Sequence, residues 1–184
     1  ARADGADTVV SVSDSVLLAV ALERNAYEGA MVFLGGDAST SGTLVAAGVD
    51  PAFLARAVAV TVHRPTLDEL VADPLVGECI DDYNSTDPAE PIDLDAMGEA
   101  EAQILALTCQ TSALVELLLT EAGPELDPDA VVAAAESLGR FELPGMVGPS
   151  LGPGKFTAGN AVRIYDFDPT TGTPVPRGAP IVVN

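Results

Sequence analysis

Basic side chains are scarce in this sequence. Lysine and arginine together number 8, against 28 aspartates and glutamates, so the formal net charge is −20 at pH 7. Nucleic acids and anionic membrane surfaces bind proteins through basic patches. The charge therefore argues against both as partners and is typical of a solvated protein surface.

Side chains that hold metals or carry out catalysis are also few. There is one histidine, His63, and there are two cysteines, Cys79 and Cys109. A tetrahedral zinc site needs four such ligands, so no metal site is predicted. A single histidine without a nucleophile beside it argues against an enzyme. No phosphate-loop or dinucleotide motif occurs, so no cofactor is predicted.

The residues alone leave two interpretations of the cysteines open. They are either free buried thiols or the two ends of one disulfide. A disulfide would close a loop of about 30 residues and stabilise the fold by roughly 3–4 kcal/mol. It would also indicate a location outside the cytoplasm, because thiols stay reduced inside it.

An uncharged apolar run of membrane-spanning length is absent too. The longest apolar segment, residues 98–123, is interrupted by Glu116 and Glu121, so a membrane span is not predicted. Its apolar residues recur at three- and four-residue steps, which predicts a helix that Gly123 ends. We expect this helix to be buried over more than half of its circumference. Its stripe consists of Ile104, Leu107, Thr108, Thr111, Val115, Leu118 and Leu119, widened by Leu114 and Leu117.

What is present is an alternation of strands and helices. β-Branched runs predict strands at residues 8–12, 31–34 and 58–62, with helical patterns at 15–28, 39–47 and 51–57. This order predicts a parallel βαβ sheet and an α/β fold. Further helices are expected at residues 66–72, 74–83 and 127–139, and an antiparallel hairpin is expected from residues 161–166 and 181–183.

Two motifs resemble known sites but lack essential parts. Residues 148–152 match G-x-S-x-G around Ser150, yet no helix follows and the only histidine lies upstream, so a hydrolase is not predicted. Asp166 and Asp168 begin a segment like a calcium loop, but Arg177 stands where the closing glutamate belongs. A hairpin turn is predicted there instead.

Candidate ligand-binding residues follow the first two strands. They are Ser13, Asp14 and Ser15 after the first strand, and Gly36 and Asp37 after the second. Ligands of open α/β sheets lie beyond the carboxyl ends of the strands. Helix-start N–H groups and serine hydroxyls suit a polar or anionic group, and a carboxylate suits an ammonium. Local sequence alone favours the alternative, that the two aspartates only cap helices.

Four stretches taken together resemble the C-terminal half of type I periplasmic binding proteins, the branched-chain amino acid class of ABC-transporter solute receptors. The segment DTVVSVSDSVLLAVALERNAYEG resembles the late lobe-2 strand and helix of that family. The segment MVFLGGDAST, followed by AVAVTVHRP, resembles its next strand, its ligand loop and the point where the chain crosses back to lobe 1. Its lobe-1 helices resemble IDDYNSTDPAEP, LTCQTSALVELLLTEAG and DPDAVVAAAESLG. Its closing lobe-2 segment resembles FELPGMVGPSLGPGKFTAGNAVRIYDFD. The likeness covers essentially the whole chain.

The resemblance implies a partial periplasmic-binding-protein-like I fold. Residues 1–64 and 140–184 would form a lobe-2 portion, and residues 65–139 a helical lobe-1 portion. In this family two lobes close on a ligand without making or breaking a bond, so the protein would be no enzyme. The family's first half, with the groove for the ligand carboxylate, has no counterpart in this sequence.

The resemblance also implies roles for specific residues. The loop Ser13–Ser15 would line the ligand, and Asp37 would take the α-ammonium of an amino-acid ligand. Cys79 and Cys109 would form a disulfide in an extracytoplasmic receptor. The implied function is the solute-binding component of an ABC importer that works with a permease. The alternative is a sensing or protein-interaction domain of the same fold, not coupled to transport. In either case we expect a missing N-terminal half or a second chain to cover the helix at residues 98–123.

Overall fold

The computed structural model describes residues 5–12, 15–34, 43–124 and 126–183, which form two compact units. Unit 1 comprises Ala1–Val62 and Val162–Ile181, and unit 2 comprises His63–Ala161 and Val182–Asn184. The chain therefore passes between the units after Val62, after Ala161 and after Ile181. The predicted division grouped residues 140–161 with residues 1–64, whereas here they belong to unit 2.

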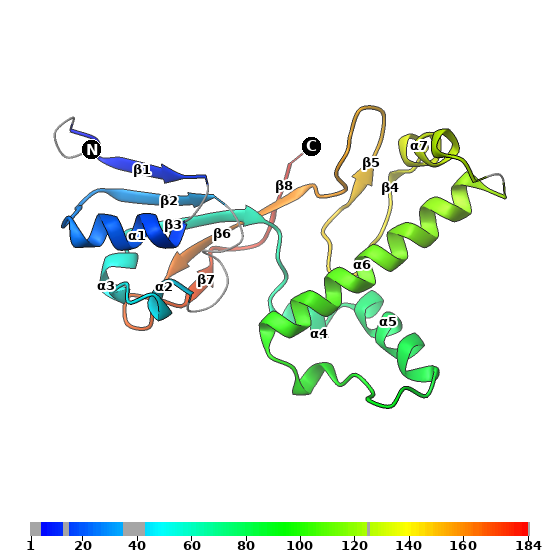
Figure 1. The fold of residues 1–184 in the computed structure, drawn as a ribbon, viewed down its shortest axis with the longest axis horizontal. Coiled ribbons are helices and arrows are strands. Elements are labelled where there is room, and N and C mark those ends of the chain that lie inside the picture. The colour runs from blue at the N-terminus through cyan, green and yellow to red at the C-terminus, as the bar shows by residue number, and fades with distance from the viewer. Residues whose placement is uncertain (1–4, 13–14, 35–42, 125, 184) are drawn as a thin grey trace. The chain divides into compact units, whose positions relative to one another are not determined.

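Unit 1 is built on a six-stranded mixed sheet with the order β1-β2-β3-β6-β7, and β8 also pairs with β6 (Figure 1). The strands β1, β2 and β3 are parallel, as predicted, and β6 pairs antiparallel with both β3 and β7. The bounds are β1 Thr8–Ser11, β2 Ala30–Leu34, β3 Ala57–Val62, β6 Ala161–Phe167, β7 Pro174–Pro176 and β8 Ile181–Val182.

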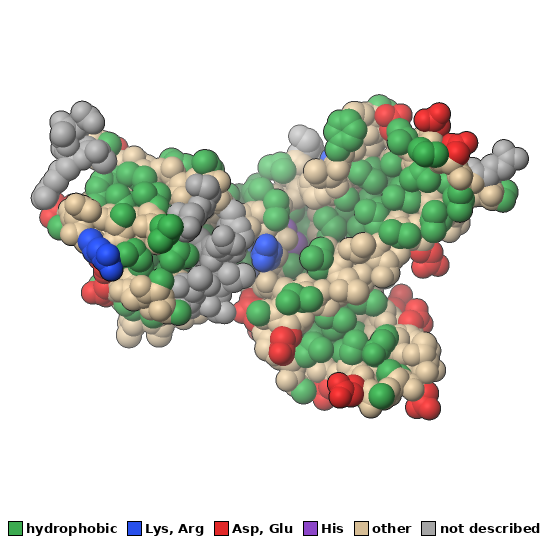
Figure 2. Space-filling view, in the orientation of Figure 1, with side chains coloured by type: hydrophobic (Ala, Val, Ile, Leu, Met, Phe, Trp, Pro, Cys, Tyr) green, Lys and Arg blue, Asp and Glu red, His purple; other side chains and the backbone are tan. Residues whose placement is uncertain are grey.

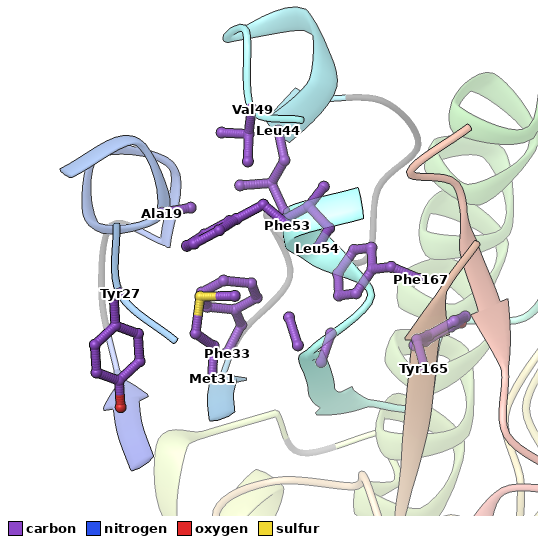
Figure 3. Packing of buried hydrophobic residues seen from close by; sticks show 12 residues of the cluster. Ala19, Tyr27, Met31, Phe33, Leu44, Val49, Phe53, Leu54, Tyr165 and Phe167 are labelled. Atoms are coloured by element: carbon purple, nitrogen blue, oxygen red, sulfur yellow. The ribbon is translucent and has the colours of Figure 1, made fainter. Parts of the chain in front are cut away.

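Three helices, α1 Ser15–Arg24, α2 Thr43–Ala46 and α3 Pro51–Leu54, connect the parallel strands. Alternate residues of β2, β3 and β6 point toward them and form the core, in which Phe33 and Phe167 meet edge to face at 6.2 Å between ring centroids. Full burial of a phenylalanine such as Phe33 contributes about 1.5–3 kcal/mol. Figure 3 shows this cluster, which comprises Ala19, Tyr27, Met31, Phe33, Leu44, Val49, Phe53, Leu54, Ala57, Ala59, Tyr165 and Phe167.

The hairpin differs from the prediction in its second strand. The sequence predicted that residues 181–183 pair with residues 161–166 as a hairpin, but β7 forms the hairpin and β8 pairs with β6 separately. The reason is the tight turn after β6. There the Asp168 carboxylate accepts the N–H groups of Thr170 at 2.8 Å and Thr171 at 2.9 Å, so the chain returns at once.

Unit 2 is mainly helical, with α4 Leu67–Val71, α5 Pro74–Ser85, η2 Leu94–Ala96, α6 Glu99–Ala122 and α7 Pro128–Ser137, and a small antiparallel pair, β4 Gly139–Arg140 and β5 Ser150–Leu151. The capping residues explain the helix starts. Asp73 and Asp127 accept N–H groups at the starts of α5 and α7, each followed by a proline whose missing N–H costs nothing there. Gly98 and Gly123 bound α6 as predicted.

The α6 helix packs against α4, α5 and α7 through small side chains. Its buried residues are Ala102, Ala106 and Cys109, and the first two join Leu70, Val76 and Ile80 in the core of unit 2. A disulfide joins Cys109 to Cys79 of α5, with 6.0 Å between the Cα atoms. The pairing that the resemblance implied is therefore confirmed.

The predicted burial of the α6 stripe is wrong within this chain. Ile104 is 68% exposed, Leu107 61%, Val115 48% and Leu119 44%, because unit 2 packs on the opposite, alanine-bearing side. Figure 2 shows hydrophobic side chains gathered over α6 and α7. By length and composition α6 could span a membrane, but its disulfide to an acidic surface helix at mid-length is at odds with a lipid environment.

Candidate functional site

The carboxyl ends of the three parallel strands lie at one edge of the unit 1 sheet. Their register pairs Ser11, the last residue of β1, with Phe33, and pairs Leu34, the last residue of β2, with Val60. Each predicted ligand segment therefore follows a strand that ends at this edge. Parallel α/β sheets bind their ligands at this edge.

Only part of the predicted site lies among the described residues. Ser15 is the first residue of α1 and is 3% exposed, and Ser11 at the end of β1 is 5% exposed. These two hydroxyl-bearing residues are therefore buried at the end of β1 and at the start of α1. Ser13, Asp14, Gly36 and Asp37 lie outside the described residues, so their role as ligand contacts stays a prediction.

Two further polar residues lie at the same edge, and the sequence analysis did not single them out. Thr61 of β3 pairs with Arg163 of β6, and both are only 3% exposed. They follow the apolar row of Phe33, Ala59 and Tyr165 on the same face, so the face changes from apolar to polar toward the carboxyl end of β3. The Thr61 hydroxyl has no hydrogen-bond partner among the described residues. The signal was a threonine within an otherwise aliphatic strand.

The Ser150 motif has a structural role. Lys155 Nζ donates to Ser150 Oγ at 2.7 Å, and it also donates to Asn160 Oδ1. The Asn160 amide donates in turn to Ser150 Oγ at 2.8 Å and to the Gly148 carbonyl at 2.7 Å. These bonds tie β5 to the segment before β6.

The aspartates of the β6–β7 hairpin are structural as well. Arg177 Nε donates to Asp166 Oδ2 at 2.9 Å, and this hydrogen bond, aided by the Arg177 charge, holds the pKa of Asp166 below its usual value. The N–H groups of Thr171 and Thr170 lower the pKa of Asp168. Among the described residues, no group of three histidine, cysteine, aspartate or glutamate side chains could hold a metal ion.

A pocket in unit 2 is lined in part by Asp73, Arg140, Phe141, Glu142 and Met146. The Asp73 carboxylate accepts the N–H groups of Leu75 and Gly145, at 2.9 Å and 2.6 Å. Because this carboxylate is already engaged in holding α5 and the loop at Gly145, the pocket is a poorer candidate than the sheet edge.

The chain's similarity to known proteins is found in its structure and not in its sequence. No protein-family model matches the sequence, and no curated protein matches it significantly. Among solved structures, the chain is similar to a branched-chain amino acid ABC transporter protein from Thermus thermophilus with bound valine, at TM-score 0.56 and 14% identity over 98% of this chain and 47% of that one.

Two further solved structures show the same similarity. One is a fatty acid ABC transporter substrate-binding protein from Thermomonospora curvata, at TM-score 0.59 and 15% identity over 100% of this chain and 45% of that one. The other is a type 1 periplasmic binding protein from Bordetella pertussis Tohama I, at TM-score 0.60 and 10% identity over 97% and 47%. The chain thus spans less than half of the length of these proteins, and it has the corresponding part of their mixed α/β fold.

Proposed function

We propose that this chain, which has about half of the type I periplasmic-binding-protein fold, is the C-terminal half of a solute-binding component of an ABC importer. The observation that carries the proposal is the share of this chain that matches solved structures. Nearly the whole chain superposes on part of a protein described as a branched-chain amino acid ABC transporter with bound valine, at TM-score 0.56, and on part of one described as a fatty acid ABC transporter substrate-binding protein, at TM-score 0.59. Both units are included in the match, so the similarity extends beyond one common βαβ motif.

The ligand in this proposal is a small amino acid or a related polar molecule. It binds at the carboxyl edge of β1, β2 and β3, where Ser13, Asp14 and Ser15 follow β1 and Gly36 and Asp37 follow β2. The Asp37 carboxylate pairs with the ligand ammonium. The Thr61 hydroxyl, buried at the same edge without a described partner, offers a further hydrogen bond to the ligand.

The protein binds its ligand without chemistry. Among the described residues, the buried polar side chains at the sheet edge are those of Ser11, Ser15, Thr61 and Arg163. The ligand is released to a membrane permease, which is the partner of such receptors. The Cys79–Cys109 disulfide supports an extracytoplasmic location, because such bonds persist in oxidising compartments.

The experiment is isothermal calorimetry on the complete receptor, the chain together with the remaining half, against the twenty amino acids, small carboxylates and fatty acids. We expect heat with one or a few amino acids and a roughly tenfold or greater loss of affinity in Asp37→Asn, because a charge-assisted hydrogen bond contributes about 1.5–3 kcal/mol. Thr61→Val is expected to weaken binding less and to leave stability unchanged. A receptor that binds nothing in the panel would contradict the proposal and would favour a sensing or protein-interaction domain.

A further inference from the structure

In unit 2, residues 150–158 form a closed loop that begins at β5, and we call it the projecting loop. Its base is closed by a hydrogen bond of 3.2 Å from the Ser150 N–H to the Ala158 carbonyl. Near its tip the Lys155 N–H donates to the Gly152 carbonyl at 2.9 Å. Figure 1 shows the loop extending past the end of β5.

The tip of the projecting loop is a tight turn with Pro153 and Gly154 at its two central positions, and Gly154 has a φ of +71°. Proline followed by a glycine with positive φ is typical of a type II turn, because proline restricts its own φ and glycine accepts the left-handed conformation. The Lys155 side chain fastens this turn, since Nζ donates to Ser150 Oγ at 2.7 Å and to Oδ1 of the buried Asn160. Hydrogen bonds at the base, at the tip and from this side chain therefore hold the loop in one conformation.

The projecting loop carries the ring of Phe156 into solvent. Phe156 is 95% exposed, more than any other large hydrophobic side chain among the described residues. Its ring therefore packs against almost nothing in that part of the chain, and the loop keeps its shape without it. Single exposed hydrophobic side chains are common, but most of them are not held on a fixed turn. A phenylalanine on a fixed turn has only its two side-chain torsions to immobilise on binding, so it is prepared to anchor a partner.

The sequence around Phe156 is free of negative charge. Residues 143–165 are the longest stretch without an aspartate or glutamate, in a chain that has 28 of them. The exposed residues of the projecting loop are Pro153, Gly154, Phe156 and Thr157. A carboxylate that is buried in an interface without a partner loses hydration that nothing replaces, so interface cores are depleted of aspartate and glutamate and enriched in aromatic residues. The projecting loop has this composition on a strongly acidic chain.

We propose that Phe156 anchors the receptor on its membrane permease, where the ring enters an apolar pocket that has no basic residue at its rim. This inference rests on the proposed function, because it takes the partner from it. The charge of the loop fits this pocket, since a basic rim would be matched by carboxylates, and this acidic chain has none at the loop.

The same observations argue against two other occupants. An anionic lipid surface needs basic residues, but the net charge is −20 and the Lys155 ammonium already binds Ser150 and Asn160. A permanently attached segment of the receptor would require a large and continuous apolar surface, such as the exposed face of α6. One ring among small uncharged residues suits a partner that binds and then dissociates, as each delivery of ligand requires.

The test is photo-crosslinking of the complete receptor in the native cell. A benzophenone amino acid replaces Phe156, which keeps an aromatic group at that position. The control replaces Tyr83, an exposed aromatic residue of unit 2 that lies on α5 beside Asp81 and Asp82. We expect crosslinks from position 156 to map, by mass spectrometry, to a protein with several membrane-spanning helices, and none to that protein from position 83. Crosslinks from position 156 to another segment of the receptor, to a second copy, to lipid or to nothing would overturn the inference.

A binding measurement does not depend on the probe. The complete receptor is sedimented with native membrane vesicles whose outer face is outward, and separately with protein-free liposomes of the same lipids. We expect saturable binding to the native vesicles alone and a roughly tenfold or greater loss of affinity in Phe156→Ala, because the ring is buried on docking. The melting temperature of this variant should equal that of the wild type, because the ring is exposed in the free chain.

Equal affinities of the two proteins for native vesicles, or binding of the wild type to the liposomes, would contradict the inference. Neither experiment uses a ligand. A receptor that gives heat with amino acids but fails both experiments therefore removes this inference and leaves the proposed function. A receptor that gives no heat with any member of the calorimetry panel removes the proposed function itself.

Discussion

Asp73 and Gly145, 72 positions apart in sequence, are joined by a hydrogen bond of 2.6 Å from the Gly145 N–H to Asp73 Oδ2. The other carboxylate oxygen accepts the Leu75 N–H at 2.9 Å and caps α5. One side chain thus fixes both the start of α5 and a distant loop of unit 2.

Asp73→Ala is therefore expected to destabilise unit 2 by about 2–4 kcal/mol, since it removes a helix cap of about 1 kcal/mol and a hydrogen bond to a charged group of about 1.5–3 kcal/mol. The measurement is urea unfolding followed by circular dichroism. Asp50→Ala is the matched control, because Asp50 also precedes a helix-starting proline and caps α3 through the Ala52 N–H at 2.8 Å. It should cost only about 1 kcal/mol. Equal effects of the two substitutions would contradict the role given to the Gly145 contact.

The Cys79–Cys109 disulfide links α5 to α6 over a separation of 30 residues. The double variant Cys79→Ala, Cys109→Ala is expected to lose roughly 3–4 kcal/mol of unfolding free energy, because the unfolded chain regains the entropy of the closed loop. Denaturant unfolding with and without dithiothreitol measures the loss. Reductant should lower the stability of the wild type by a similar amount and leave the double variant unchanged. A wild type that is insensitive to reductant would show that the bridge does not form in solution.

Gly172 in the β6–β7 turn has a φ of +70°, and a Cβ there would lie 2.3 Å from Val45 Cγ2 and 3.4 Å from Leu54 Cδ1. Gly178 has a similar φ of +74°, but nothing lies within 4 Å of its Cβ position. Both alanine variants incur the left-handed backbone cost of about 1–2 kcal/mol, and Gly172→Ala additionally overpacks the core by about 1–3 kcal/mol. In thermal unfolding, Gly172→Ala should have a clearly lower melting temperature than Gly178→Ala. The same melting temperature for both would mean that the turn does not approach α2 and α3.

The hairpin aspartates set a pH dependence. Backbone N–H groups of Thr171 and Thr170 lower the pKa of Asp168 from its usual value of 3.8, and the Arg177 hydrogen bond lowers that of Asp166. A carboxyl whose pKa is lower in the folded state stabilises the fold above its unfolded pKa, and this contribution is lost as pH falls through the folded pKa. We therefore expect stability to fall below about pH 4 and Asp168→Asn to lessen that fall. NMR titration of the carboxyl groups measures the pKa of Asp168 directly. An Asp168 pKa at or above 3.8 would contradict the hydrogen-bonded turn.

Local signals in the sequence were sufficient for much of this structure. The glycines at positions 98 and 123 mark the ends of α6, and Asp127 followed by Pro128 marks the start of α7, because capping depends on neighbouring residues. The three aliphatic runs at β1, β2 and β3 predicted the parallel strands, since each run is followed by a helical pattern.

Non-local features were not predictable in the same way. The antiparallel pairing of β3 with β6 joins segments about a hundred residues apart, such as Val60 and Ile164, and no local pattern encodes it. The apolar stripe of α6 predicted burial, but hydrophobicity gives no information about which polypeptide covers a face. For the candidate site, the sequence indicated the loops after β1 and β2. Thr61 was missed because one threonine in an aliphatic strand is a common occurrence.

The central claim of the proposed function is that another polypeptide segment covers the exposed apolar face of α6. The most direct measurement is sedimentation velocity of this 184-residue chain alone, with binding of an apolar fluorescent dye measured in parallel. The wild type is expected to self-associate and to bind the dye. The variant Ile104→Gln, Leu107→Gln should do so less, with its unfolding free energy changed by no more than about 0.5 kcal/mol per substitution because both side chains are exposed. A wild-type chain that sediments as a single monomer and binds no dye would contradict the claim.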